Sequence, residues 1–288
     1  MNFEIRKIPA AELPEQLREI PQPPKELYVV GAPLPHDARY LAVVGSRAST
    51  RYGEMACERL IAGLSGSGIY IVSGLALGID SAAHRAALRS GLPTIAFPGS
   101  GLSERALYPA NNLGLAKEII ANGGSLVSEF APNERARDFF FPQRNRLMAG
   151  LCHATLVIEA ADKSGTLITA RMALDYNREV LAVPGPIDQK NSIGANRLIR
   201  MGATPITCAE DILEVFGVAP ALNPEQQTLH LDLSDAEKNI LSLLSNSLSR
   251  DELFRASGME ITAYNILLSA MELRGLLKEE FGEIRSCI

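Results

Sequence analysis

Six short apolar runs, each followed by a stretch of helix length, constrain the fold of this chain more than any other feature. Each run is continuous rather than alternating, which is typical of strands buried on both faces of a parallel sheet. The first intervening stretch places Ala56, Leu60 and Leu64 on one helical stripe. The runs are 40–45, 69–74, 94–99, 125–130, 154–160 and 179–185. This alternation predicts an α/β fold with a doubly wound Rossmann-like parallel sheet.

Changes in composition along the chain predict four segments. Residues 1–39 are rich in proline and read as an extended lead-in, and residues 40–217 form the Rossmann-like domain. A polar linker, 218–233, precedes a separate unit at 234–288. In that unit a helix with a Ser234–Glu237 capping box, two further helices and a short hairpin follow one another. That order predicts a small C-terminal winged-helix-like domain.

The composition argues against several classes of protein. The 288 residues are 47% hydrophobic, enough for a core, but no window reaches the roughly 20 apolar residues of a membrane helix. The N-terminus lacks the apolar region of a signal peptide, so a cytoplasmic protein with no membrane partner is expected. The four cysteines are scattered and only four histidines occur, so neither a metal site nor a cofactor is expected.

Small and polar residues follow each predicted strand, where ligands bind in open parallel sheets. Several of these turns lead directly into helices, whose free amides attract anions. We single out Gly45, Ser46 and Arg47 after the first run, Gly74 after the second, and Lys163, Ser164, Gly165 and Thr166 after the fifth. These turns predict an anion-binding site at one rim of the sheet.

The common nucleotide and hydrolase motifs do not explain this anion site. The turn "GSRAST" is not a dinucleotide fingerprint, and "KSGT" places its lysine on the wrong side for a P-loop. No nucleophile elbow or kinase carboxylate set occurs. Glu129 and Glu159 are candidates for an acid–base pair, although bonds to backbone amides or an arginine are the favoured interpretation.

An unusual cluster of arginine and phenylalanine lies at 135–146, in a chain with net charge −5. A single nucleic-acid strand offers phosphates to arginines and exposed base faces to aromatic rings. The cluster therefore predicts a binding surface for one strand, in which Phe139 or Phe140 touches a base. Two of the three phenylalanines at 139–141 are expected to be core. Pro142 is expected in the first turn of the following helix, with Arg144 and Arg146 near its start.

Nine motifs in this order resemble the DNA-processing protein A family (DprA, also called Smf). They include "AVVGSRAST", "IVSGLALGIDSAAHRAAL", "FPQRNRLMAGL" and "KSGTLITARMAL", and the resemblance runs over about residues 13–217. The C-terminal unit also resembles the family's winged-helix-like segment. The N-terminal helical domain of many members is not expected, because residues 1–40 are too short to hold it.

The resemblance implies a non-enzymatic protein that binds single-stranded DNA. Family members protect incoming strands in natural transformation, load the RecA recombinase and pair as homodimers through the Rossmann domain. Carried over to this chain, one family motif begins at Phe141 and Pro142 and continues through Arg146. The motifs imply DNA contacts by Gly45, Ser46, Arg47, Arg144, Asn145, Arg146, Ser164, Gly165 and Thr166, with Lys163 as a supporting charge.

Two competing functions fit the sequence less well than this one. Nucleotide phosphoribohydrolases resemble it in fold, but their glutamate two or three residues beyond the threonine is missing, since Ile168 and Thr169 stand there. The function of a winged-helix transcription factor is disfavoured by the negative charge of the C-terminal unit. Residues 234–288 have a net charge of −3, and the expected recognition helix at 262–273 has no basic residue. We therefore expect the small domain to serve protein contacts or to cover part of the main domain.

Overall fold

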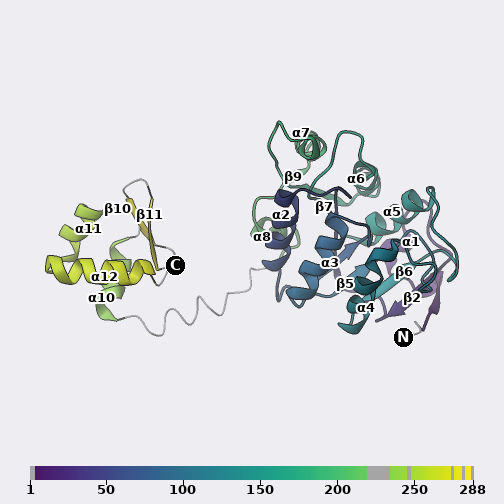
Figure 1. Ribbon diagram of the computed structural model, residues 1–288, viewed down its shortest axis with the longest axis horizontal. Helices are drawn as coiled ribbons and strands as arrows, with labels where there is room; N and C mark the ends of the chain where they lie inside the picture. The colour runs from purple at the N-terminus through teal and green to yellow at the C-terminus, as the bar shows by residue number, and fades with distance from the viewer. Residues whose placement is uncertain (1–3, 219–233, 245–247, 274–275, 281–282, 287–288) are drawn as a thin grey trace. The chain divides into compact units, whose positions relative to one another are not determined.

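The chain folds into two compact units, residues 1–221 and 222–288. The computed structural model (Figure 1) describes residues 4–218, 234–244, 248–273, 276–280 and 283–286. Residues 219–233, which make up most of the predicted linker, lie outside the described residues.

A nine-stranded sheet forms the centre of the large unit, in the order β1-β2-β6-β5-β4-β3-β7-β8-β9. From β6 to β9 all neighbouring strands are parallel. These strands are β3 (Arg39–Val44), β4 (Ile69–Ser73), β5 (Thr94–Ala96), β6 (Ser125–Ser128), β7 (Ala154–Val157), β8 (Glu179–Ala182) and β9 (Thr204–Pro205). All six predicted strands are present and parallel, so the predicted Rossmann-like sheet is confirmed.

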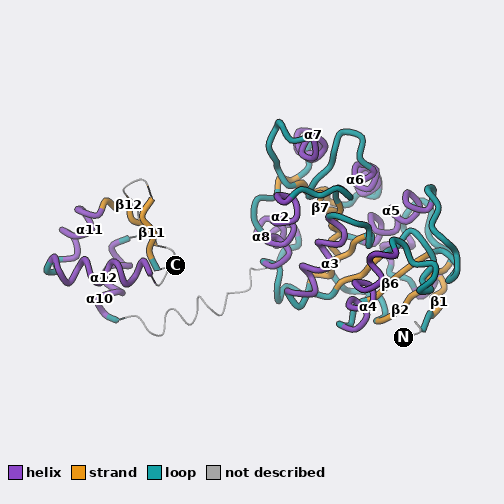
Figure 2. Tube along the Cα trace, in the orientation of Figure 1, coloured by secondary structure: helices purple, strands orange, loops and turns teal. Residues whose placement is uncertain are grey.

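The first 39 residues are built more closely into this sheet than the sequence predicts. β1 (Arg6–Pro9) pairs with β2 (Glu26–Gly31), and β2 pairs antiparallel with β6. Between them lie a short 3-10 helix (Ala10–Glu12) and α1 (Glu15–Arg18). Leu17 and Leu27 are fully buried. The predicted lead-in thus supplies the edge strand β1, the neighbouring strand β2 and part of the core, and Figure 2 shows β1, β2 and β6 together.

Helices cover both faces of the sheet, as the doubly wound prediction requires. One buried cluster contains side chains of α1, α5 (Phe140–Leu151), α6 (Gly165–Asp175) and α7 (Ile193–Arg200). The cluster on the opposite face contains side chains of α2 (Arg51–Ala62), α3 (Ile79–Arg89) and α8 (Ala209–Val215). α4 (Leu113–Ala121) packs beside β5 and β6 in a third cluster. Short 3-10 helices at Ala110–Asn112 and Lys190–Ser192 precede α4 and α7.

The strand order creates one topological switch point. β3 lies at the centre, β4 to β6 extend from it in one direction, and β7 to β9 extend in the other. The chain leaving β3 continues into α2 on one face, while the chain leaving β7 continues into α6 on the other. The two turns diverge beyond the carboxyl ends of β3 and β7, where α/β sheets hold their ligands.

The small unit contains three helices and a three-stranded sheet among its described residues. In chain order these are α10 (Asp235–Leu243), β10 (Leu248–Ser249), α11 (Arg250–Ser257), α12 (Ile261–Leu273), β11 (Leu277–Glu280) and β12 (Glu283–Ser286). Ile240, Leu253, Tyr264 and Leu268 form its buried core. The capping box at Ser234 and Glu237 is present. The order of elements is that of a winged helix-turn-helix, and the assignment to that class stays a prediction.

Candidate functional site

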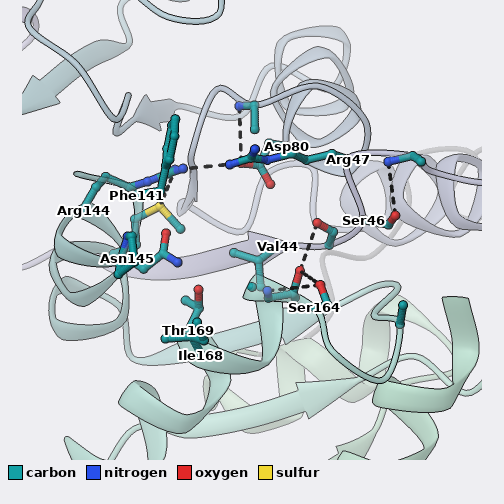
Figure 3. Close-up of a pocket in the computed structure, with 18 residues that line it drawn as sticks. Val44, Ser46, Arg47, Asp80, Phe141, Arg144, Asn145, Ser164, Ile168 and Thr169 are labelled. Atoms are coloured by element: carbon teal, nitrogen blue, oxygen red, sulfur yellow. Dashed lines mark hydrogen bonds and ion pairs between the residues drawn. The ribbon is translucent and has the colours of Figure 1, made fainter. Parts of the chain in front are cut away.

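A pocket of about 460 Å³ opens at the switch point, between the turns that follow β3 and β7. Most of its wall comes from the turn after β3, the start of α6 and one face of α5, and Asp80 of α3 also contributes. Eight of the predicted site residues line it, namely Gly45, Ser46, Arg47, Arg144, Asn145, Ser164, Gly165 and Thr166. In Figure 3, Phe141, Arg144 and Asn145 lie on one side of the pocket, and Ser46 and Ser164 on the other.

The start of α6 is held in place by hydroxyl groups. Ser164 caps the helix, and its Oγ accepts a hydrogen bond from the Thr166 amide at 3.2 Å. The Thr166 hydroxyl donates to the Gly45 carbonyl at 3.1 Å, which ties this turn to the turn after β3. A Cβ at Gly165 would meet nothing within 4 Å, so the pocket is open over this residue. The positive end of the helix dipole therefore faces an open space that fits an anion.

Arg144 brings a buried cation to the other side of the pocket. Only 5% of the residue is exposed, and its guanidinium lies 3.9 Å from the Asp80 carboxylate and 3.2 Å from the Met148 sulfur. Its Nε has no hydrogen-bond partner among the described residues. This guanidinium is thus incompletely paired, and an anion in the pocket would supply the missing acceptors.

Burial changes the protonation energetics of this pair. It lowers the pKa of Arg144 to about 10, although Asp80 opposes the change, so the guanidinium stays charged at neutral pH. Burial also raises the pKa of the Asp80 carboxyl above its ordinary value, against the effect of Arg144. Each charge therefore depends on the other to remain ionised inside the protein.

Gly74, predicted to touch DNA, makes room for Arg144 instead of facing the main pocket. A Cβ at this position would lie 1.4 Å from the Arg144 guanidinium and 2.4 Å from the Asp80 carboxylate. Gly74 lines only a small adjoining hollow of about 50 Å³. Its role in this structure is to let the guanidinium pass the end of β4.

An aromatic ring, Phe141, separates the main pocket from the surface beside it. The Arg47 guanidinium lies 4.7 Å from its centroid, and the Tyr108 ring lies 5.8 Å away on a tilt of 51°. The ring rests against Gly99, where a Cβ would come within 2.5 Å of it. Arg47 is itself exposed, so a cation and a ring face are presented together.

The structure rules against one of the two phenylalanines predicted to touch a base. Phe140 is 4% exposed and stacks on Phe130 at 3.7 Å, so it belongs to the core and is not available to a base. Phe139 is 54% exposed but does not line the main pocket, and a base contact by its ring stays a prediction. Phe141, which sequence reasoning did not choose for base contact, does line it. The sequence contains evidence for this choice, because positions 141, 144, 145 and 148 lie on one face of a helix.

Replacing Phe141 by leucine is expected to weaken binding of a single strand by on the order of tenfold, because one stacked base contributes about 1–3 kcal/mol. Phe139→Leu, an exposed matched control, is expected to retain wild-type affinity. Fluorescence anisotropy with a labelled oligothymidine measures both. A larger loss in Phe139→Leu than in Phe141→Leu would show that the base contacts the other ring.

Arg146 and Lys163, also predicted to contact DNA, are not brought into the pocket. Arg146 donates to the Glu129 carboxylate at 2.6 Å and to the Gln22 carbonyl at 2.6 Å. Because it follows Arg144 by two residues, about 200° around the helix, it projects from the opposite face. Lys163 is exposed and does not line the pocket. Arg146 therefore holds the segment before β2 onto α5, and a DNA contact by Lys163 stays a prediction.

The two glutamates considered as an acid–base pair have structural roles. Glu159 is buried and accepts hydrogen bonds from the Thr50 amide, at 3.0 Å, and from the Thr50 hydroxyl. Glu129 is paired with Arg146. The interpretation favoured from the sequence is thus confirmed for both. The one carboxylate among the described residues that line the pocket is Asp80, and it faces Arg144.

Two further constraints hold within the described residues. No helix in that part of the chain is long and apolar enough to cross a membrane. No group of three or more His, Cys, Asp or Glu side chains there is arranged to hold a metal ion.

Fold and pocket together define a Rossmann-like protein with an open pocket, lined by arginines, backbone amides and hydroxyls, at the switch point of its sheet. The family model described as DNA recombination-mediator protein A matches residues 5–217, and the chain belongs to that family. The resemblance drawn from the sequence is confirmed.

Individual relatives agree with this assignment. Protein Smf of Escherichia coli K12 is 40% identical over 79% of this chain and 63% of its own length. DNA processing protein DprA of Streptococcus pneumoniae is 45% identical over 61% of each chain. The chain thus spans about three fifths of the length of these curated relatives.

Two solved structures show the same fold. The X-ray structure of DNA processing protein A from Streptococcus pneumoniae matches with a TM-score of 0.67 and 38% identity, covering 73% of this chain and 74% of that chain. DNA processing protein A from Helicobacter pylori matches with a TM-score of 0.67 and 29% identity, and the match covers 75% of this chain and 98% of that chain. The Helicobacter pylori structure is described as giving insight into a single-stranded DNA binding mode of that protein.

Proposed function

We propose that this chain binds single-stranded DNA without cleaving it and acts as a mediator of DNA recombination. The observation that carries the proposal is the convergence of the α6 N-terminus, the buried Arg144 and the Arg47–Phe141 pair on one open pocket. Membership of the recombination-mediator family supports it, as does the single-stranded DNA binding described for the Helicobacter pylori protein.

The chemistry of the pocket suits one unpaired nucleotide at a time. The Ser164–Thr166 turn and the two arginines offer donors and positive charge to phosphate oxygens. The Phe141 ring offers a face to a base, which is reachable only where that base is not stacked in a duplex. No pair of free carboxylates occurs among the described residues that line the pocket, so acid–base hydrolysis by a phosphoribohydrolase has no support there.

The partners implied by the family belong to the same proposal. They are the RecA recombinase, which would be loaded onto the bound strand, and a second copy of this chain in a homodimer. A role in natural transformation and a cytoplasmic location complete it. Light scattering tests the homodimer, and co-precipitation with purified recombinase in the presence of a single strand tests the loading partner.

Wild-type protein is expected to bind an oligothymidine at least about tenfold more tightly than a duplex of equal length, and the affinity should fall as salt rises. Arg47→Ala should weaken single-strand binding several-fold, since it removes both a phosphate donor and the cation beside Phe141. A gel-shift or filter titration measures these affinities, and electrophoresis of the recovered strand shows whether it remains intact.

Arg171→Ala is the matched control, because Arg171 is an exposed arginine on α6 paired with Asp175 at 3.1 Å and does not line the pocket. It should bind like the wild type. Equal affinity for duplex and single strand, equal losses in the two arginine variants, or a shortened strand would each contradict the proposed function.

A further inference from the structure

A second hollow, of about 630 Å³, adjoins the main pocket at Phe141. Tyr108, whose ring packs on Phe141, lines it with 47% of its surface exposed. A small hollow lined by Arg47, Tyr108 and Phe141 connects the two larger ones. The pocket at the switch point therefore continues along the surface past two aromatic rings.

Arginines dominate the charge of this second hollow. Arg105, Arg135 and Arg137 line it, against the single carboxylate of Asp138 among the described lining residues. Arg105 and Arg135 are exposed and have no hydrogen-bond or ion-pair partner among the residues that the structure describes. The Arg137 guanidinium is 4.0 Å from Glu134 and 5.9 Å from the Phe139 centroid. Two unpaired guanidinium groups at a concave surface favour a polyanion.

A third hollow, of about 500 Å³, is also lined by Arg47 but contains more negative charge than the second hollow does. Arg85 and Arg89 line it together with Glu54 and Glu58. Arg89 is already paired with Glu58 at 2.9 Å. A polyanion leaving the main pocket would meet two glutamates along this path, whereas Asp138 is the carboxylate that it would meet along the other. The charges thus favour a path from the main pocket into the second hollow over a path into the third hollow.

Building on the proposed function, we propose that the hollow lined by Arg105, Tyr108, Arg135 and Arg137 is a second subsite for the same DNA strand. The main pocket holds one nucleotide against Phe141, and the chain of phosphates then continues past Tyr108 toward Arg105 and Arg135. The exposed Tyr108 ring offers a face to the next base, while the arginines neutralise flanking phosphates. Long strands then bind more tightly than strands that fill only the main pocket.

The double variant Arg105→Ala/Arg135→Ala separates this subsite from the main pocket. Full-length protein is titrated with an oligothymidine of about 4 nucleotides and with one of about 16, the lower and upper lengths of typical single-strand sites. The variant should bind the long strand on the order of tenfold more weakly and the short strand as the wild type does. Its slope of log affinity against log salt for the long strand should be shallower by about 1.4, because two phosphate contacts are lost.

Arg85→Ala is the control, since Arg85 is also exposed and lines the third hollow, which contains Glu54 and Glu58. It should leave both strands unaffected. A double variant that binds the long strand like the wild type, or one that loses both lengths equally, overturns the second subsite while the proposed function stands. Failure of the wild type to bind either length would overturn the proposed function as well.

Discussion

Arg144→Met is expected to lower the free energy of unfolding of the large unit by about 3 kcal/mol and to weaken single-strand binding by on the order of a hundredfold. The loss of stability follows from burial, because methionine fills a similar volume but leaves the Asp80 carboxylate, 7% exposed, without its cation. The loss of binding follows from the position of the guanidinium in the pocket. Urea denaturation followed by circular dichroism and an oligothymidine titration measure the two effects.

The double variant Arg144→Met/Asp80→Asn separates the two roles. Removing the negative charge of Asp80 should restore most of the stability, since no unpaired ion remains buried. Binding should not recover, because the cation is still missing from the pocket. Recovery of both properties together would mean that Arg144 acts only by supporting the fold.

The stability of Arg144→Met should also depend on pH. Burial already raises the pKa of the Asp80 carboxyl, and Arg144 opposes that rise, so the substitution raises this pKa further. Between the ordinary and the raised pKa the native state binds a proton that the unfolded state does not bind. Stability should therefore increase as pH falls from neutral through the raised pKa of Asp80, and the gain should be absent in the double variant.

Much of the fold could be predicted because local pattern and topology agree. The continuous apolar runs specified the six parallel strands, since only a sheet covered on both faces buries such runs. The contribution of β2 was missed because the proline-rich residues around it concealed a short strand, "ELYVVG", whose partner β6 lies about 100 residues further along. Long-range antiparallel pairing leaves little trace in local sequence.

The candidate site was predictable in its turns and less so in its side chains. The turns containing Ser46 and Ser164 meet because both follow strands on either side of the switch point. The orientation of α5 determines which of its side chains line the pocket. Phe141 and Arg144 point into it, whereas Phe140 and Arg146 point away. The start of α5 could not be placed closely from the sequence, and without it the choice between adjacent residues stayed open.

Gly165 offers the sharpest test of how the pocket binds a strand. It is the first residue of α6, and a Cβ there would meet no atom within 4 Å. An aspartate at this position should leave the fold intact, because a carboxylate in the first turn of a helix is favourable by about 0.3–1 kcal/mol. The same carboxylate would occupy the space proposed for a phosphate, and like charges there repel.

The most direct measurement compares Gly165→Asp with its neutral counterpart Gly165→Asn in an oligothymidine titration. The two side chains differ little in size, so charge is the main variable. Gly165→Asp should bind at least about tenfold more weakly than Gly165→Asn, with an equal or higher melting temperature. Equal affinities for the two folded variants would contradict the proposed binding mode, because no phosphate could then lie at the start of α6.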